Sequence, residues 1–101
     1  MRHRIGLYAE LWESDLVAAH AGGTRVLVIR LGNEVHAYED RCPHLGLALS
    51  EGTLDGCVLT CAAHHWQYDV VTGRGINPPT ACMKRFPVTI EHGVVYVELP
   101  P

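Results

Sequence analysis

Two short segments of the chain each place a cysteine close to a histidine. Cys42 and His44 are separated by one residue, Cys61 and His64 by two, and sixteen residues lie between His44 and Cys61. Thiolate sulfur and neutral imidazole nitrogen are both common ligands of iron and zinc in proteins. Each segment offers one sulfur and one nitrogen, so the four side chains together predict a metal centre.

Two cysteines with two histidines are the ligand set of one kind of [2Fe–2S] cluster, in which the cysteines hold one iron and the histidines hold the other. We predict that Cys42 and Cys61 bind one iron, that His44 and His64 bind the second, and that the cofactor is one such cluster. A structural zinc site fits less well, because its first ligands are usually a closely spaced pair of cysteines. Two buried cysteines beside unrelated histidines would leave the matched pairs unexplained.

The charge of this ligand set indicates what the centre does. With two thiolates and two neutral imidazoles the oxidised centre is neutral overall, whereas four thiolates would leave it with two negative charges. An electron enters a neutral centre more easily, and the reduction potential rises to about −150 to +300 mV, against about −400 mV for plant-type ferredoxins. All four protein ligands are fixed and no coordination position is open, so we predict electron transfer and no catalysis.

Composition excludes several other classes of function. The 101 residues are predicted to form one domain, residues 1–101. The formal net charge is −3 and there is no basic stripe, which argues against nucleic-acid binding. No long apolar run follows the N-terminal residues, so we expect no signal peptide, no membrane anchor and a cytoplasmic protein. Cys57 and Cys82 are expected to be small buried hydrophobic side chains.

The elements that must position the ligands are predicted to be short strands joined by turns, and the chain is predicted to be all-β. Alternating or β-branched runs indicate strands, and Gly22-Gly23, Gly32-Asn33 and His92-Gly93 indicate turns. Trp12 is expected in the core or at its rim, and His36 at the surface or a sheet edge. The expected strands lie within residues 3–12, 15–21, 25–31, 34–39, 57–60, 66–70, 86–91 and 94–99.

Residues 41–80 differ in composition from the rest of the chain, because glycine and proline recur throughout them. We therefore predict an antiparallel basal unit, a sandwich or barrel, from about residues 1–40 and 81–101. A loop-rich cluster-binding subdomain of about residues 41–80 is inserted into it.

Around Cys42-Pro-His-Leu-Gly46 and Cys61-Ala-Ala-His-His-Trp66 the sequence resembles the soluble Rieske-type ferredoxins, and the resemblance covers nearly the whole chain. Leu49–Gly52 and Gly73–Pro78 are most similar to the ferredoxins of toluene and toluene/o-xylene monooxygenase systems. The resemblance implies the three-sheet Rieske fold, with the cluster at one tip and its histidines near solvent. It also implies two partners, an NADH-dependent flavin/iron–sulfur reductase that supplies electrons and a di-iron hydroxylase that receives them.

The chain departs from the high-potential Rieske proteins around the cluster. Leu47 and Ala63 stand where those proteins carry a disulfide, so that bridge cannot form. Trp66 stands where they place a serine that donates to the cluster, and an indole has only an N–H donor. Tyr68 can still offer a hydroxyl to a ligand sulfur, so Trp66 and Tyr68 are expected to tune a potential near the lower end of the range. His65 occupies a position often held by glycine, where a solvated tip residue is the simplest interpretation.

Electron transfer needs the cluster close to its partner, so we predict that partners meet the tip that carries the histidines. The candidate docking residues are mostly apolar, and the prolines among them reduce the ordering cost of docking. The other interpretation is that Leu45 and Leu47 only shield the cluster from water. The predicted docking tip comprises Pro43, Leu45, Leu47, His65, Trp66 and the loop Asn77-Pro78-Pro79.

Three other functions share these ligands. One is the ferredoxin of a Rieske ring-hydroxylating dioxygenase, and another is the small Rieske subunit of an assimilatory nitrite reductase. The third is a redox sensor or stand-alone binding module. The Gly75-Ile-Asn-Pro78 stretch favours the monooxygenase ferredoxin.

Overall fold

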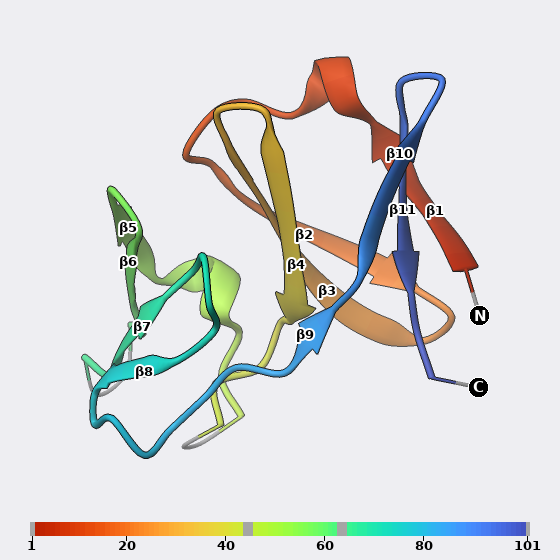
Figure 1. Ribbon diagram of the computed structural model, residues 1–101. Coiled ribbons are helices and arrows are strands. Elements are labelled where there is room, and N and C mark those ends of the chain that lie inside the picture. Colours follow the sequence, from red (N-terminus) through yellow and green to blue (C-terminus); the bar gives the residue numbers. More distant parts are fainter. Residues whose placement is uncertain (1, 44–45, 63–64, 101) are drawn as a thin grey trace.

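The computed structural model describes residues 2–43, 46–62 and 65–100. Within these ranges the chain forms eleven strands and two single-turn 3₁₀ helices, so the prediction of an all-β protein is confirmed. The strands form three antiparallel sheets (Figure 1). No helix in the described part of the chain is long and apolar enough to cross a lipid bilayer.

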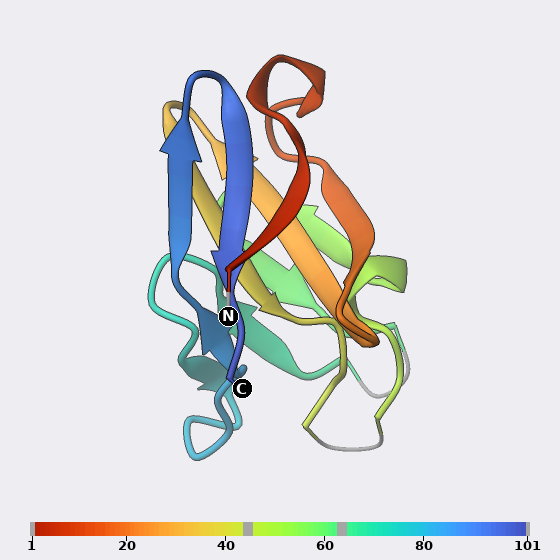
Figure 2. The ribbon, with the colours of Figure 1, turned by 90° about the vertical axis from the view of Figure 1, so that its right-hand side faces the viewer.

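Sheet A joins the two ends of the chain. It has the order β1-β11-β10, and β1 pairs with β11 so that Arg2 lies opposite Glu98. Figure 2 shows the N-terminus and the C-terminus at the same side of the molecule. The strands are β1 (Arg2–Leu7), β10 (Val88–Glu91) and β11 (Val94–Glu98), and the 3₁₀ helix η1 (Tyr8–Glu10) follows β1.

Sheet B is the middle sheet and has the order β2-β3-β4-β9. Its first three strands are consecutive hairpins, and the predicted turns at Gly22-Gly23 and Gly32-Asn33 connect them. Gly22, Gly23 and Gly32 have φ of 55°, 82° and 61°, which glycine adopts without steric cost. The strands are β2 (Leu16–Ala21), β3 (Thr24–Leu31), β4 (Glu34–Glu39) and β9 (Arg85–Phe86).

Sheet C has the order β5-β6-β7-β8 and lies wholly between β4 and β9 in the sequence. Its strands have three residues each, and two of them, β5 and β8, were not predicted because so short a run shows no periodicity. The 3₁₀ helix η2 (Leu49–Glu51) precedes this sheet. The strands are β5 (Thr53–Asp55), β6 (Val58–Thr60), β7 (Gln67–Asp69) and β8 (Gly75–Asn77).

Strand β3 separates two hydrophobic cores. Val26, Leu27, Val28 and Ile29 are all fully buried. Successive side chains of a strand point to opposite faces, so Val26 and Val28 pack with sheet A whereas Leu27 and Ile29 pack with sheet C. The continuous run of large apolar residues is therefore explained by burial on both faces.

The predicted strand over residues 86–91 is wrong as a single element. The chain forms β9 in sheet B and then β10 in sheet A, with Pro87 between them. Proline has no N–H to donate to a ladder, and its carbonyl accepts instead from Glu98 N–H at 2.9 Å. The break lets one segment pass from the middle sheet to the outer one.

Two side-chain predictions are also wrong. Trp12 is 77% exposed, so it belongs neither to a core nor to its rim. His36 is 5% exposed, because it lies on β4 beneath Arg85 of β9. Its Nδ1 lies 3.1 Å from an Arg85 nitrogen, and its Nε2 lies 3.4 Å from a Glu34 carboxylate oxygen. The Arg85 contact gives Nδ1 a partner, whereas the buried Nε2 makes no hydrogen bond within the described part of the chain.

Two side chains of sheet B hold the turn between β7 and β8. The Tyr38 hydroxyl donates to Val70 O at 2.7 Å, and Arg85 donates to Val71 O at 2.7 Å. Tyr38 is fully buried, so no water can replace its hydrogen bond. These contacts fix sheet C against sheet B.

We predict that Tyr38→Phe lowers the unfolding free energy by about 1–2 kcal/mol, because Val70 O would stay buried without a donor. Tyr8→Phe is the matched control, since its exposed hydroxyl donates to Gly32 O at 3.3 Å. We expect the control to change stability by less than about 0.5 kcal/mol. Thermal unfolding followed by circular dichroism measures both, and equal effects would contradict the importance of the Tyr38 contact.

Candidate metal centre

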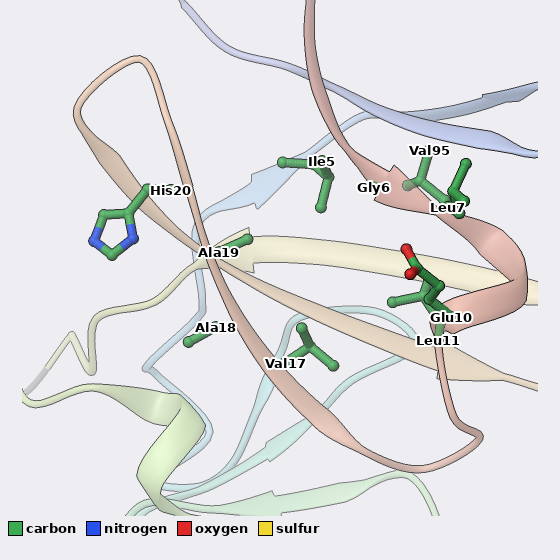
Figure 3. Close-up of a pocket in the computed structure, with 10 residues that line it drawn as sticks. All are labelled: Ile5, Gly6, Leu7, Glu10, Leu11, Val17, Ala18, Ala19, His20 and Val95. Atoms are coloured by element: carbon green, nitrogen blue, oxygen red, sulfur yellow. The ribbon is translucent and has the colours of Figure 1, made fainter.

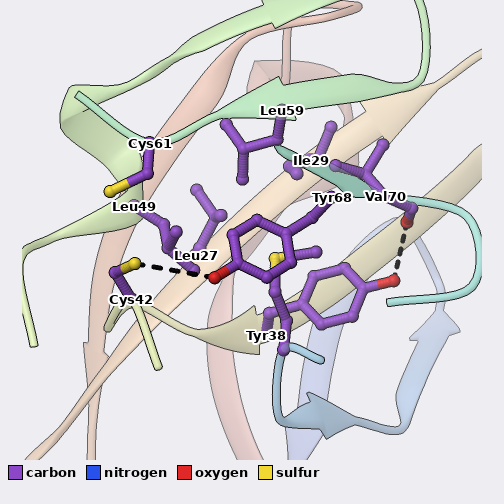
Figure 4. Packing of buried hydrophobic residues seen from close by; sticks show 10 residues of the cluster. Leu27, Ile29, Tyr38, Cys42, Leu49, Leu59, Cys61, Tyr68 and Val70 are labelled. Atoms are coloured by element: carbon purple, nitrogen blue, oxygen red, sulfur yellow. Dashed lines mark hydrogen bonds between the residues drawn. The ribbon is translucent and has the colours of Figure 1, made fainter. Parts of the chain in front are cut away.

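Both predicted sulfur ligands are buried in the core shared by sheets B and C. Cys42 follows β4 and Cys61 follows β6, and each is 2% exposed. Both belong to the same cluster of buried residues, and Figure 4 shows them at one end of it. The strand ends therefore bring together two thiols that are far apart in the sequence. His44 and His64 lie outside the described residues.

The first ligand segment is closed by backbone hydrogen bonds. Cys42 N–H donates to Leu47 O at 2.7 Å, and Gly46 N–H donates to Cys42 O at 2.8 Å. Gly46 has φ of 76°, and a Cβ there would lie 3.1 Å from the Arg41 side chain. Glycine is thus favoured both by backbone conformation and by space.

The second ligand segment is closed in the same way. Cys61 N–H donates to Trp66 O at 2.8 Å, and His65 N–H donates to Cys61 O at 3.1 Å. In both segments the cysteine N–H reaches the fifth residue onward, and the fourth residue returns a hydrogen bond and has a positive φ. In the sequence, each predicted histidine ligand lies between the cysteine and the residues that close its loop.

Tyr68 on β7 contacts one of the two sulfurs. Its hydroxyl lies 3.6 Å from Cys42 Sγ, and the residue is fully buried (Figure 4). Burial raises the pKa of the Tyr68 phenol, and the contact with Cys42 raises it further. The hydroxyl therefore keeps its proton at neutral pH and is a donor toward a thiolate at Cys42.

Sequence reasoning missed Asp40 and Ser50, which fasten the first loop to η2. Asp40 is 2% exposed, and its two carboxylate oxygens accept from Ser50 N–H at 2.8 Å and from Ser50 Oγ at 2.7 Å. Its own N–H donates to Arg25 O at 2.9 Å. An acidic side chain at the end of a strand is normally exposed to solvent. Only the position of Asp40 directly before the first ligand segment could have indicated this role.

The structure separates the predicted docking residues by exposure. Pro43, Leu47, His65 and Pro79 are exposed, whereas Pro78, which follows a cis peptide bond, is half-buried. Trp66 is half-buried and packs against the core that contains both cysteines, which suits a tuning residue better than a docking residue. Asn77 is exposed, and Leu45 lies outside the described residues.

The expectation for the other two cysteines is wrong. Cys57 and Cys82 are both exposed. Cys57 lies in the tight turn between β5 and β6, and Cys82 lies in the connection that leads to β9. Residues in such surface connections are not packed on all sides, so small apolar character did not lead to burial.

The described residues fit the sulfur-ligated half of the predicted cluster. The two thiols are buried together and lie in matching backbone loops, and a neutral hydroxyl faces one of them. Thiolates in such a site need hydrogen-bond donors and exclusion of water, and Tyr68 and the surrounding core supply both. Cys42 and Cys61 could therefore hold one iron.

The surface also has a hollow away from the two cysteines. It has a volume of about 430 Å³ between β1 and β2, and none of the predicted ligands lines it (Figure 3). Its wall is mostly apolar, with Glu10 and His20 as its charged or titratable members.

Comparison with known proteins agrees with this geometry. A family model described as the Rieske [2Fe-2S] domain matches residues 2–87. The ferredoxin component of the alkene monooxygenase system of Xanthobacter autotrophicus is 39% identical over 94 residues, which cover 91% of this chain and 76% of the relative.

Solved structures match over almost the whole chain. The Sphingomonas yanoikuyae B1 ferredoxin has a TM-score of 0.88 at 27% identity and covers 99% of this chain and 100% of its own. The ferredoxin in a complex of reduced oxygenase and oxidised ferredoxin of carbazole 1,9a-dioxygenase has a TM-score of 0.84 at 32% identity. That match covers 94% of this chain and 99% of the other. With the paired cysteine loops, these matches show that the chain belongs to the Rieske [2Fe–2S] domain family, among ferredoxins of oxygenase systems that transfer electrons rather than catalyse a reaction.

Proposed function

We propose that this protein carries single electrons from an NADH-dependent flavin/iron–sulfur reductase to the di-iron hydroxylase of an aromatic monooxygenase of the toluene/o-xylene type. The observation that carries the proposal is the burial of Cys42 and Cys61 together, each in a loop closed by the same hydrogen bonds. The monooxygenase assignment is supported by the relative from an alkene monooxygenase system. The toluene/o-xylene assignment and the reductase rest on the sequence motifs alone.

In this proposal the ligands of the cluster are Cys42, His44, Cys61 and His64. A cluster held by these residues would supply transfer of one electron at a time. The surrounding core keeps water from the two sulfurs, and the Tyr68 hydroxyl donates toward Cys42 Sγ. With four fixed protein ligands there is no position for a substrate, so the organic substrate is bound by the partner hydroxylase.

The proposal includes a division of labour within the chain. The basal unit, about residues 1–40 and 81–101, supports the cluster-binding part, about residues 41–80. Partners meet the tip of the latter, where Pro43, Leu47, His65 and Pro79 are exposed. We propose a cytoplasmic location, where a reduced nicotinamide cofactor is available to the reductase.

A ring-hydroxylating dioxygenase is the second candidate partner. The observation that favours it is the 32% identity to the ferredoxin in the carbazole 1,9a-dioxygenase complex. Both candidates use the same electron-carrier chemistry, so they differ only in the protein that accepts the electron.

We predict that purified protein contains about two iron atoms and two acid-labile sulfides per chain. Replacing His64 by Cys adds a thiolate where a neutral imidazole stood, so the potential should fall. Iron and sulfide analysis with voltammetry provides both measurements. Zinc without sulfide would contradict the cofactor, and an unchanged potential in an intact H64C cluster would contradict the ligand assignment.

We predict that Tyr68→Phe lowers the reduction potential. A hydroxyl donor stabilises the more negative, reduced state, so its loss makes reduction harder. A change of about 0.5–1.5 kcal/mol for one hydrogen bond corresponds to about 20–65 mV for one electron.

The matched control is Tyr38→Phe, which removes a buried hydroxyl that donates to Val70 O and contacts no sulfur ligand in the described structure. Its potential should stay at the wild-type value. Equal shifts in the two variants would show that loosening of the core, and not the contact with Cys42, sets the potential.

Reconstituted turnover separates the two candidate partners. We expect the reduced protein to support hydroxylation by a toluene-type di-iron monooxygenase, with much slower turnover when a ring-hydroxylating dioxygenase replaces it. Omission of this protein is the control for direct transfer from the reductase. Faster turnover with the dioxygenase would select the second candidate.

A further inference from the structure

Asp40 is a buried acidic side chain with no cationic partner. It is 2% exposed, and its two oxygens accept from Ser50 N–H at 2.8 Å and from Ser50 Oγ at 2.7 Å. Both oxygens act as acceptors, as an ionised carboxylate requires. Among the described residues, no lysine, arginine or histidine forms an ion pair with it. The donors of Ser50 are neutral, so they stabilise the negative charge of Asp40 without cancelling it.

The basic side chains nearest to Asp40 along this surface are exposed. Arg25 and Arg41 line the same small hollow as Asp40, with a volume of about 230 Å³, and both are exposed. The Arg41 side chain lies against the first ligand loop, because a Cβ on Gly46 would lie 3.1 Å from its Nε. Water and salt screen exposed charges far more than buried ones. The buried carboxylate therefore keeps most of its field toward the interior.

The carboxylate lies close to the sulfur ligands. Asp40 precedes Cys42 by two residues, so the two Cα atoms are at most about 7 Å apart. Its partner Ser50 follows Leu49, which belongs to the buried cluster that contains Cys42 and Cys61 (Figure 4). Charges interact more strongly through such an interior than through water. Asp40 is thus a negative charge held beside the site for the iron–sulfur cluster.

We propose that Asp40 lowers the reduction potential of the cluster by its fixed negative charge, and that Ser50 holds this charge in place. The inference rests on the proposed function, because it requires an electron to enter at this site. Reduction adds one negative charge to the cluster, and a carboxylate nearby opposes that charge. A lower potential makes the reduced protein a stronger electron donor to its acceptor.

The effect of Asp40 is opposite to that of Tyr68. The Tyr68 hydroxyl donates toward Cys42 Sγ and favours the reduced state, whereas the Asp40 carboxylate disfavours it. The competing interpretation is that Asp40 only fastens the first ligand loop to η2. The two interpretations differ in one measurable respect, since a charge acts on the potential even when the loop geometry is unchanged.

Three variants separate charge from geometry. Asp40→Asn removes the charge but keeps an oxygen that can accept from Ser50 N–H. Ser50→Ala keeps the Asp40 charge but removes the hydroxyl that donates to it. Asp15→Asn is the matched control, because Asp15 is an exposed carboxylate that also accepts from a backbone N–H, that of Leu16 at 3.1 Å.

Voltammetry of each variant with its cluster, at one neutral pH and one salt concentration, measures the effect. We expect Asp40→Asn to raise the equilibrium constant for reduction by about 3- to 10-fold, the size expected for one charge at roughly 10 Å in a partly buried site. This corresponds to a rise of about 30–60 mV for one electron. Ser50→Ala should lower the unfolding temperature but leave the equilibrium constant within about twofold of the wild type. Asp15→Asn should change neither quantity.

Asp40→Ser is a second neutral variant, and it should also raise the potential. A wild-type potential in Asp40→Asn would overturn the inference, and so would an equal rise in Ser50→Ala, which would assign the effect to loop geometry. Loss of the cluster from both neutral variants, with its retention in Ser50→Ala, would show that the carboxylate serves assembly and would also overturn it. Absence of a [2Fe–2S] cluster from the wild type would contradict the proposed function itself.

Discussion

The burial of β3 on both faces is the constraint on which the rest of the structure depends. Val26 and Val28 close the core against sheet A, and Leu27 and Ile29 close the core against sheet C. The same strand thereby supports the pairing of the chain ends and the core that contains Cys42 and Cys61. Loss of packing on one face of β3 would also disturb the packing on its other face, because the two sets of side chains alternate along one backbone.

Polar contacts order the ligand loops, in addition to the apolar packing of β3. Backbone hydrogen bonds from and to each cysteine close its loop, and the buried Asp40 carboxylate ties the first loop to Ser50. Tyr68 adds a donor to Cys42, and Tyr38 uses the same chemical group to hold the turn after β7. The two buried tyrosine hydroxyls thus meet different atoms, since that of Tyr38 donates to a backbone carbonyl and that of Tyr68 lies beside a cysteine sulfur.

The surface near the loops combines exposure with strain. Leu47 is 42% exposed, and His65 keeps a side chain where the first loop has glycine. In the interior, both carboxylate oxygens of Asp40 accept hydrogen bonds from Ser50, whereas the buried Nε2 of His36 makes none within the described residues.

The sequence by itself determined the central elements and the chemistry of the site. The β-branched run over residues 25–31 predicts a strand, the glycine turns predict its hairpins, and the spacing of two Cys–His pairs predicts the cluster. Only the tertiary structure decided which polar residues are buried and how the chain moves between sheets. His36 is buried because Arg85 comes from a distant strand, Cys57 and Cys82 are exposed because their surface connections lack cover, and the strand at residues 86–91 divides because Pro87 cannot donate to a ladder. Local patterns record which side of a strand is apolar, but partners far along the chain determine what finally covers each side chain.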